Sequence, residues 1–117
     1  MLFSVSATMN SVDVYYAAID TVSDDLERWR MSIPKEFRPG EPFRPQHFMN
    51  PCAMEVALKT HYLYYNAVFS FSRLTLHVGA ERSDERQAKS KRDLMNAARV
   101  VIELTRYIDP EAYTPIW

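Results

Sequence analysis

The sequence contains a single cysteine, Cys52, among its 117 residues. A disulfide framework within the chain is therefore impossible, and one cysteine cannot build a cysteine-based zinc site. Glycine is also scarce, with only 2 in the chain. This scarcity excludes the glycine-rich loops that cradle phosphate groups, and it argues against a many-stranded β fold, which needs many tight turns.

Long hydrophobic runs and targeting signals are absent as well. The longest apolar region, residues 61–76, is interrupted by Arg73, and a membrane-spanning helix needs roughly 20 apolar residues. The opening stretch MLFSVSATMN lacks the basic region and the apolar run of a signal peptide. A formal net charge of -1 gives no general attraction to nucleic acid. We therefore expect a soluble intracellular protein without membrane contact.

The first third of the chain carries the apolar pattern of a helix. Apolar residues recur at alternating spacings of three and four, at Val12, Tyr15, Ile19, Val22, Leu26, Trp29 and Ile33. This pattern is the stripe of one helical face and predicts a helix over residues 11–32, with Ser11 as the N-cap. Pro34 ends the pattern. Trp29 is then predicted to be the last large packing anchor of this helix.

A proline-rich loop and a second helix follow. Five prolines fall within residues 33–51, which predicts an extended loop. The aromatic side chains interleaved with them, including Phe37 and Phe43, predict a loop that is anchored on a helical core. Asn50 followed by proline is a typical helix start. The second helix is predicted over residues 52–78, apolar on more than one face and therefore buried among neighbours.

A third helix is predicted over residues 84–108. Its start is either Ser83 with Asp84 or, alternatively, Ser90, and Asp109-Pro110 ends it. Its predicted core stripe consists of Leu94, Ala97, Val101, Leu104 and Ile108. The fold class is thus all-α: a helical bundle fragment of about three long helices with a proline-rich anchored loop, over residues 1–117.

Catalytic and metal-binding patterns are missing from the sequence. His61 and His77 lie on the same predicted helix but point to nearly opposite faces, so they cannot share a metal ion. His61 as a general base and Cys52 as a nucleophile are conceivable, but a core histidine and a free structural cysteine are favoured. Adjacent Asp24 and Asp25 indicate a solvated acidic face. We assign no catalytic, cofactor-binding or metal-binding residue, and we expect no cofactor in this chain.

Two further clusters are candidates for binding. An aromatic cluster on the second helix either lines a pocket for an aromatic or lipid-like ligand or, as is more common, forms plain core; it comprises Tyr62, Tyr64, Tyr65, Phe69 and Phe71. A basic cluster is interleaved with acidic residues and indicates a mixed, solvated surface without direct nucleic-acid contact; it comprises Arg82, Arg86, Lys89, Lys91 and Arg92.

Three ordered segments carry a resemblance to a known family. They are LERWRMSIPKEF before the proline-rich loop, LKTHYLYYNAVFSFSRLTLH after it, and KRDLMNAARVVIELTRYID leading to YTPIW. Together, from Leu26 to Trp117, they resemble the regulatory middle region of fungal-specific transcription factors, whose members usually carry an N-terminal binuclear zinc cluster. Leu74 and Leu94 stand where the family often has proline and cysteine.

The resemblance implies a regulatory, non-catalytic and nuclear protein segment whose DNA-binding zinc cluster is absent from this chain. It also implies a fragment, a truncated gene product, or a paralogue without the DNA-binding module. The expected partners are the missing helices of the same domain, a second copy, another protein or a small-molecule effector. The alternative is a stand-alone helical-bundle protein that binds a small apolar ligand or a partner helix. An enzyme based on His61 and Cys52 ranks third.

Overall fold

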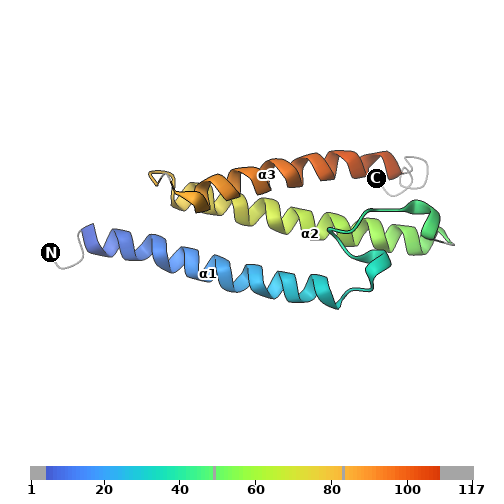
Figure 1. Ribbon diagram of the computed structural model, residues 1–117, viewed down its shortest axis with the longest axis horizontal. Coiled ribbons are helices and arrows are strands. Elements are labelled where there is room, and N and C mark those ends of the chain that lie inside the picture. The colour runs from blue at the N-terminus through green and yellow to red at the C-terminus, as the bar shows by residue number, and fades with distance from the viewer. Residues whose placement is uncertain (1–4, 49, 83, 109–117) are drawn as a thin grey trace, which may run out of the picture.

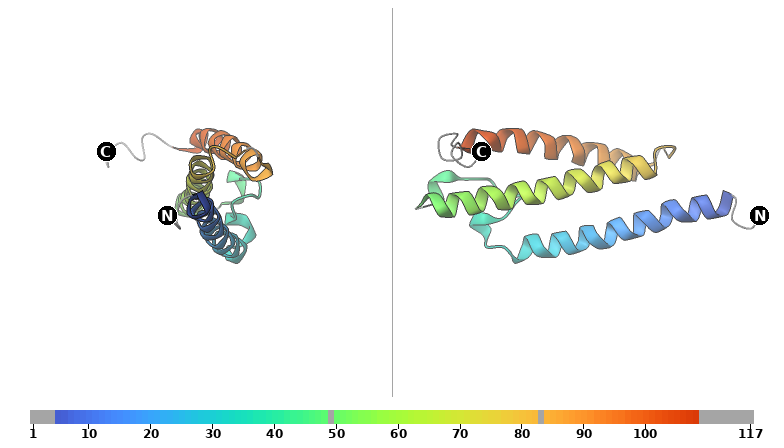
Figure 2. Two further views of the ribbon diagram at one scale, coloured as in Figure 1. Left: turned by 90° about the vertical axis from the view of Figure 1, so that its left-hand side faces the viewer. Right: turned by 180° about the vertical axis from the view of Figure 1, so that it is seen from behind.

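The computed structural model describes residues 5–48, 50–82 and 84–108 and shows an all-α fold of three long helices (Figure 1). The helices are α1, Val5–Ser32, α2, Pro51–Val78, and α3, Glu85–Leu104. The predicted fold class is confirmed. The helices lie side by side, with α1 and α3 on opposite sides of α2, and the loop after α1 covers one face of this row (Figures 1 and 2).

The predicted start of the first helix is wrong. Helix α1 begins at Val5, so Ser11 lies inside it and is not its N-cap. The stretch from Val5 to Asn10 contains neither glycine nor proline, and nothing in it interrupts a helix. Asp13 consequently sits far from the first turn, and it forms an ion pair with Arg82 instead, at 3.0 Å. The helix is continuous through Asp24 and Asp25.

The predicted buried face of α1 is wrong in its orientation. Tyr15, Val22 and Trp29 are exposed, at 52%, 45% and 36% of their surface. The residues turned toward the rest of the protein are Val12, Tyr16, Ile19, Ser23, Leu26, Arg30 and Ile33. This set keeps the spacing of three and four but includes a serine and an arginine, and a search for apolar residues alone does not assign such residues to the buried face. Trp29 is therefore not the packing anchor of the helix.

Helices α2 and α3 form the core. Leu58 and Tyr65 from α2 pack with Ala97 and Leu104 from α3, and all four are buried. Ala97 is fully buried, and its small side chain allows the two helices to approach closely. One face of α2 remains exposed, however, since Leu63 is 62% accessible. The prediction that α2 is surrounded on most sides was therefore too broad.

The ends of α2 match the sequence signals. The Asn50 side chain accepts a hydrogen bond from the Ala53 backbone N–H at 2.8 Å, with Pro51 at the first helical position. At the start of α3, the Asp84 side chain accepts from the Gln87 backbone N–H at 3.0 Å. Ser90 is inside this helix, so the alternative start there is wrong. Ser83 and residues 109–117 lie outside the described residues.

The end of α3 falls short of the prediction. The α-helix stops at Leu104, and a single 3-10 turn, η3, spans Thr105–Tyr107. The Thr105 hydroxyl donates to the Ile102 carbonyl at 2.5 Å, a side-chain contact that competes with regular helix continuation. Ile108, predicted to be the last core residue, is exposed.

The proline-rich loop is anchored, as predicted. It contains two short 3-10 helices, η1, Lys35–Phe37, and η2, Pro45–His47. The Phe43 ring contacts the Phe48 ring of the loop, with centroids 5.8 Å apart, and the Tyr107 ring beyond α3, at 4.8 Å. These aromatic contacts fix the loop across α2 and the end of α3.

Candidate functional site

Tyr16 attaches the first half of α1 to the junction of α2 and α3. Its hydroxyl accepts a hydrogen bond from the Gln87 Nε2 atom at 2.8 Å, and the same nitrogen donates to the Thr75 carbonyl, also at 2.8 Å. All three residues are buried. The guanidinium carbons of Arg82 and Arg86 lie over the Tyr16 ring, 5.3 and 4.4 Å from its centroid. Tyr16 thus combines hydrogen bonding with cation–π contact.

The close approach at Tyr16 depends on Gly79, which follows α2. A Cβ atom at this position would lie 1.9 Å from the Tyr16 hydroxyl oxygen and 2.5 Å from Gln87 Nε2. Its φ of -108° is open to any residue. Glycine is therefore needed here for space and not for backbone conformation.

Arg30 attaches the other end of α1 to the proline-rich loop. Its guanidinium donates to the Pro39 carbonyl at 3.0 Å and pairs with Glu27 at 2.5 Å. Pro39 is fully buried. Gly40 beside it has a φ of 92°, which non-glycine residues rarely adopt. Helix α1 is therefore attached near its middle, at Tyr16, and near its C-terminal end, at Arg30.

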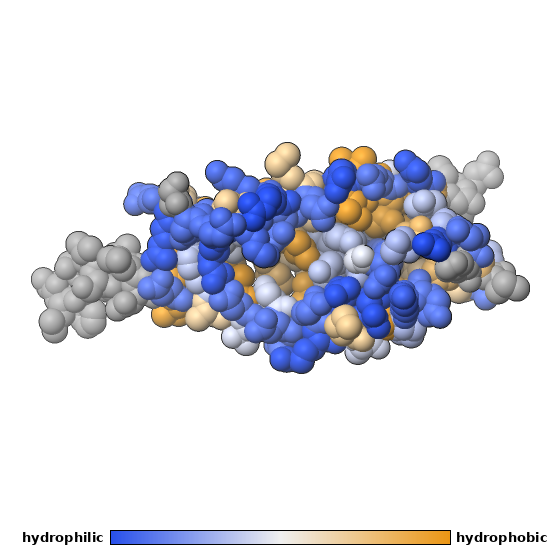
Figure 3. All heavy atoms as spheres, viewed as in Figure 1, coloured by the Kyte–Doolittle hydropathy of each residue, from blue (hydrophilic) through white to orange (hydrophobic). Residues whose placement is uncertain are grey.

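Between these two attachments a groove runs along all three helices. Its volume is about 730 Å³, which is within the range of small-molecule sites. We call it the three-helix groove; it is lined by Ile19, Asp20, Ser23, Leu26, Glu27, Gly40, Tyr64, Tyr65, Val68, Phe71, Ser72, Thr75, Glu85, Arg86, Lys89, Ser90, Asp93 and Asn96. The space-filling view shows this face hollowed along its middle, with hydrophobic residues inside and hydrophilic residues around them (Figure 3).

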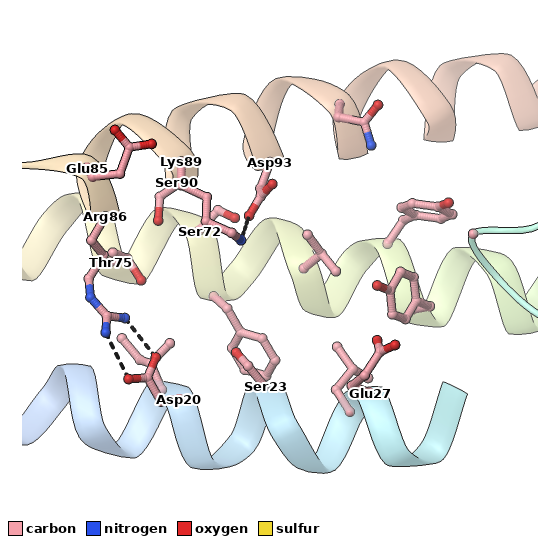
Figure 4. Close-up of a pocket in the computed structure, with 18 residues that line it drawn as sticks. Asp20, Ser23, Glu27, Ser72, Thr75, Glu85, Arg86, Lys89, Ser90 and Asp93 are labelled. Carbon is pink, nitrogen blue, oxygen red and sulfur yellow. Dashed lines mark hydrogen bonds and ion pairs between the residues drawn. The ribbon is translucent and has the colours of Figure 1, made fainter. Parts of the chain in front are cut away.

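The groove mixes apolar contact with hydroxyl groups. Ser72, Thr75 and Ser90 are buried, at 5%, 3% and 9% exposure, and their short side chains leave space above them. Ser23 faces them from α1 (Figure 4). Within the described residues, neither histidine nor cysteine lines the groove. The arrangement therefore offers hydroxyl groups for hydrogen bonds together with apolar contact.

The rim of the groove is charged, with an excess of carboxylates. Four acidic and two basic side chains line it. Arg86 donates to both carboxylate oxygens of Asp20, each at 2.8 Å, and Lys89 pairs with Asp93 at 2.7 Å (Figure 4). The hydrogen bond from Arg86 lowers the pKa of Asp20 below its usual value. The Asp20–Arg86 pair bridges α1 and α3 across one end of the groove.

A second cavity, of about 410 Å³, is lined by His61 and lies between the loop, α2, the end of α3 and η3. We call it the His61 cavity; it is lined by Glu41, Phe43, His61, Tyr65, Val100, Glu103, Leu104, Arg106 and Tyr107. The His61 side chain is 3% exposed, and burial lowers its pKa below the usual value. Its ring stands edge-on to Phe43, with centroids 5.3 Å apart.

The structure divides the predicted aromatic cluster between packing and cavities. Tyr64, Tyr65 and Phe71 line the three-helix groove, and Tyr65 also lines the His61 cavity. Tyr62 and Phe69 pack against the core. Tyr65 also belongs to the buried core, so the two interpretations of this cluster, a pocket wall and plain core, overlap at this residue.

The predicted basic cluster is only partly a solvated surface. Arg82 and Arg86 reach across to α1, where they pair with Asp13 and Asp20. Lys89 and Arg92 pair within α3. The sequence reasoning missed the link to α1. Asp13 and Asp20 lie two turns apart on one face of α1, and this spacing could have indicated an acidic face for a basic partner.

The remaining residues discussed as possible sites in the sequence lie apart from one another in the structure. Cys52 is exposed at the start of α2, and His77 is exposed at its end. Asp24 and Asp25 are exposed on α1, where Asp25 pairs with Arg28. Across the described part of the chain, no three or more His, Cys, Asp or Glu side chains are placed to hold a metal ion. None of the described helices has the length and hydrophobicity to cross a membrane.

Comparison with known proteins gives two similar sequences. The chain is 27% identical to an ABC-transporter-regulating transcription factor of Aspergillus fumigatus and 27% identical to one of Aspergillus oryzae. Each alignment covers 99% of this chain but 14% of the relative, so the chain spans about a seventh of the length of these curated relatives. No family model matches the chain, and no solved structure matches it. The chain is thus distantly similar to fungal transcription factors along its whole length.

Proposed function

We propose that this chain is a regulatory, non-catalytic segment of a nuclear fungal transcription factor of the type with a regulatory middle region, and that DNA binding belongs to another part of a longer protein. The observation that carries the proposal is the similarity over 99% of the chain to two fungal transcription factors. Because the names of both relatives refer to ABC transporters, the genes of such transporters are the first targets to test.

Regulation by this segment would act through protein contacts. The three-helix groove is open along α1, α2 and α3, and Tyr15, Val22 and Trp29 form an exposed apolar stripe on α1. Exposed apolar surfaces of this kind mark interaction sites. Further helices of the same protein, a second copy or another protein are the partners that would cover them, and regulation would follow from their engagement or release.

A reporter assay tests the proposal. Residues 1–117 are fused to an unrelated DNA-binding domain in a fungal host, and reporter output is compared with that of the DNA-binding domain alone. We expect the fusion to change the output in one direction, activation or repression. Val68, half-buried in the groove, is replaced by lysine, and we expect Val68→Lys to remove the change because a charge would then occupy an apolar wall.

The matched control lies two residues earlier on the same helix. Asn66 is exposed on α2 and does not line the groove, so Asn66→Lys should leave the reporter output unchanged. Immunoblots and circular dichroism must show that both variants are folded and equally abundant. Equal output from the fusion and the DNA-binding domain alone would refute the proposed regulatory role.

The alternative function is a stand-alone helical-bundle protein that binds a small apolar ligand or a partner helix. The observation that favours it is the size of the three-helix groove, about 730 Å³. It predicts that small apolar ligands raise the melting temperature of the isolated chain, since a ligand that binds the folded state stabilises it. It also predicts no effect of the chain on the reporter.

A further inference from the structure

His61 is a mostly buried side chain that lines the His61 cavity. It is 3% exposed; within the described residues its ring nitrogens form no hydrogen bond, and they are not fully enclosed by protein atoms. Its recorded neighbours are the rings of Phe43 and Tyr65, with centroids at 5.3 and 6.5 Å. An imidazole whose nitrogens reach a cavity can hydrogen-bond to a molecule bound there.

The cavity beside this histidine has the size and walls of a ligand site. At about 410 Å³ it lies within the range of small-molecule pockets. Phe43, Tyr65 and Tyr107 provide aromatic walls, and Leu104 is apolar. The walls come from the loop, α2, α3 and the turn after α3, so the site exists only when these elements are assembled.

The charges around the cavity favour an uncharged ligand. Glu41, Glu103 and Arg106 line it, and two carboxylates against one guanidinium leave no net positive charge for an anion. A charged ligand would lose its hydration on entering this cavity, which costs free energy, and burial keeps the His61 imidazole neutral by lowering its pKa. A neutral imidazole has one N–H donor and one acceptor nitrogen, so it can bond a hydroxyl or an N–H group.

We propose that the His61 cavity binds an uncharged aromatic molecule of about two fused rings, whose hydroxyl or N–H group hydrogen-bonds to the His61 imidazole. The aromatic walls would hold the ring system by stacking and edge contact, and His61 would select against ligands without the polar group. This site is separate from the three-helix groove, although Tyr65 contributes to both. The proposal does not depend on the regulatory function proposed above.

The test uses the full chain with two probes, 2-naphthol and naphthalene. Binding is followed by fluorescence, and the ring nitrogens of the histidines are followed by ¹⁵N NMR during the titration. We expect 2-naphthol to shift the His61 ring nitrogens and to bind more tightly than naphthalene by about fivefold, the effect of one ordinary hydrogen bond. His77, exposed at the end of α2, should not shift.

Two variants separate the hydrogen bond from the fit of the cavity. His61→Phe keeps a planar ring but removes the polar atoms, so we expect it to lose the preference for 2-naphthol over naphthalene. His77→Phe is the matched control and should keep that preference. If His61→Phe does not fold, the NMR titration of the unmodified chain still decides the question.

Two results would overturn the proposal. One is unchanged His61 ring nitrogen signals at saturating 2-naphthol, and the other is equal affinity of the unmodified chain for the two probes. Chemical shift changes confined to Ser72, Ser90 and their neighbours would place binding in the three-helix groove, and that outcome also contradicts a His61 site. A failed reporter assay would leave the result of this titration unaffected.

Discussion

Two adjacent tyrosines on α1 provide the sharpest test of the fold. Tyr16 is 6% exposed and Tyr15 is 52% exposed, although the sequence pattern predicted the reverse. We expect Tyr16→Ala to lower the free energy of unfolding by about 3 to 5 kcal/mol, as found for buried aromatic residues. The loss comprises ring burial, the hydrogen bond from Gln87 and the contacts with two guanidinium groups.

Tyr15→Ala is the matched control for this prediction. Both substitutions replace tyrosine by alanine in the interior of the same helix, so the gain in helix propensity, about 0.5 kcal/mol, is the same in each. Because Tyr15 is half exposed, we expect its replacement to cost less than about 1 kcal/mol. The difference between the two variants then measures the orientation of α1 and not the chemistry of the substitution.

Urea unfolding followed by circular dichroism gives both values. Equal costs within about 0.5 kcal/mol, or a greater cost for Tyr15→Ala, would mean that α1 does not turn Tyr16 toward Gln87, and the described packing of α1 would be refuted. The measurement is repeated at several protein concentrations. A cost for Tyr15→Ala that rises with concentration would show instead that a second copy covers the exposed stripe on α1.

Two further predictions concern Gly79 and His61. Gly79→Ala should lower the free energy of unfolding, measured in urea, by about 1 to 3 kcal/mol, because its Cβ atom would meet the Tyr16 hydroxyl. The loss should be smaller in a Tyr16→Phe background, which lacks this hydroxyl. Equal losses in both backgrounds would contradict the close approach. Burial holds the pKa of His61 below its unfolded value of about 6.5, so the unfolded state takes up a proton at higher pH than the folded state does. The free energy of unfolding should therefore fall as the pH drops from 7.5 to 5.5, by at most about 1.4 kcal/mol per pH unit. The same titration of His61→Phe should be flatter, and identical slopes would show that His61 is not buried in its neutral form.

Local signals predicted the parts of the fold that depend on neighbours in sequence. Asn50 and Pro51 define the start of α2, because capping and the fixed φ of proline act within one turn. The anchored loop followed from phenylalanines placed between prolines. Ser11, by contrast, has the chemistry of an N-cap but no role as one, since nothing before it stops the helix.

The orientation of α1 could not be predicted from hydrophobicity alone. Two stripes with the same spacing share Val12, Ile19, Leu26 and Ile33, and they differ only at the intervening positions. The apolar alternative has Trp29 where the structure turns Arg30 inward, and Arg30 is held there by the Pro39 carbonyl. The partners that decide the orientation lie on other elements, so no local pattern reports them.

The three-helix groove follows from the same long-range contacts. Tyr16 and Arg30 attach α1 near its middle and near its end. Their hydrogen bonds reach partners outside α1, on α3 and on the loop. Between them the inward positions of α1 are Ile19, Ser23 and Leu26, which are too short to fill the space over the small side chains of α2 and α3. A larger residue at Ser23 is expected to fill part of the groove, and Ser23 takes part in neither attachment. The groove thus depends on small side chains on all three helices, and Ser23 is the one on α1 whose replacement should change the space in the groove without removing either attachment.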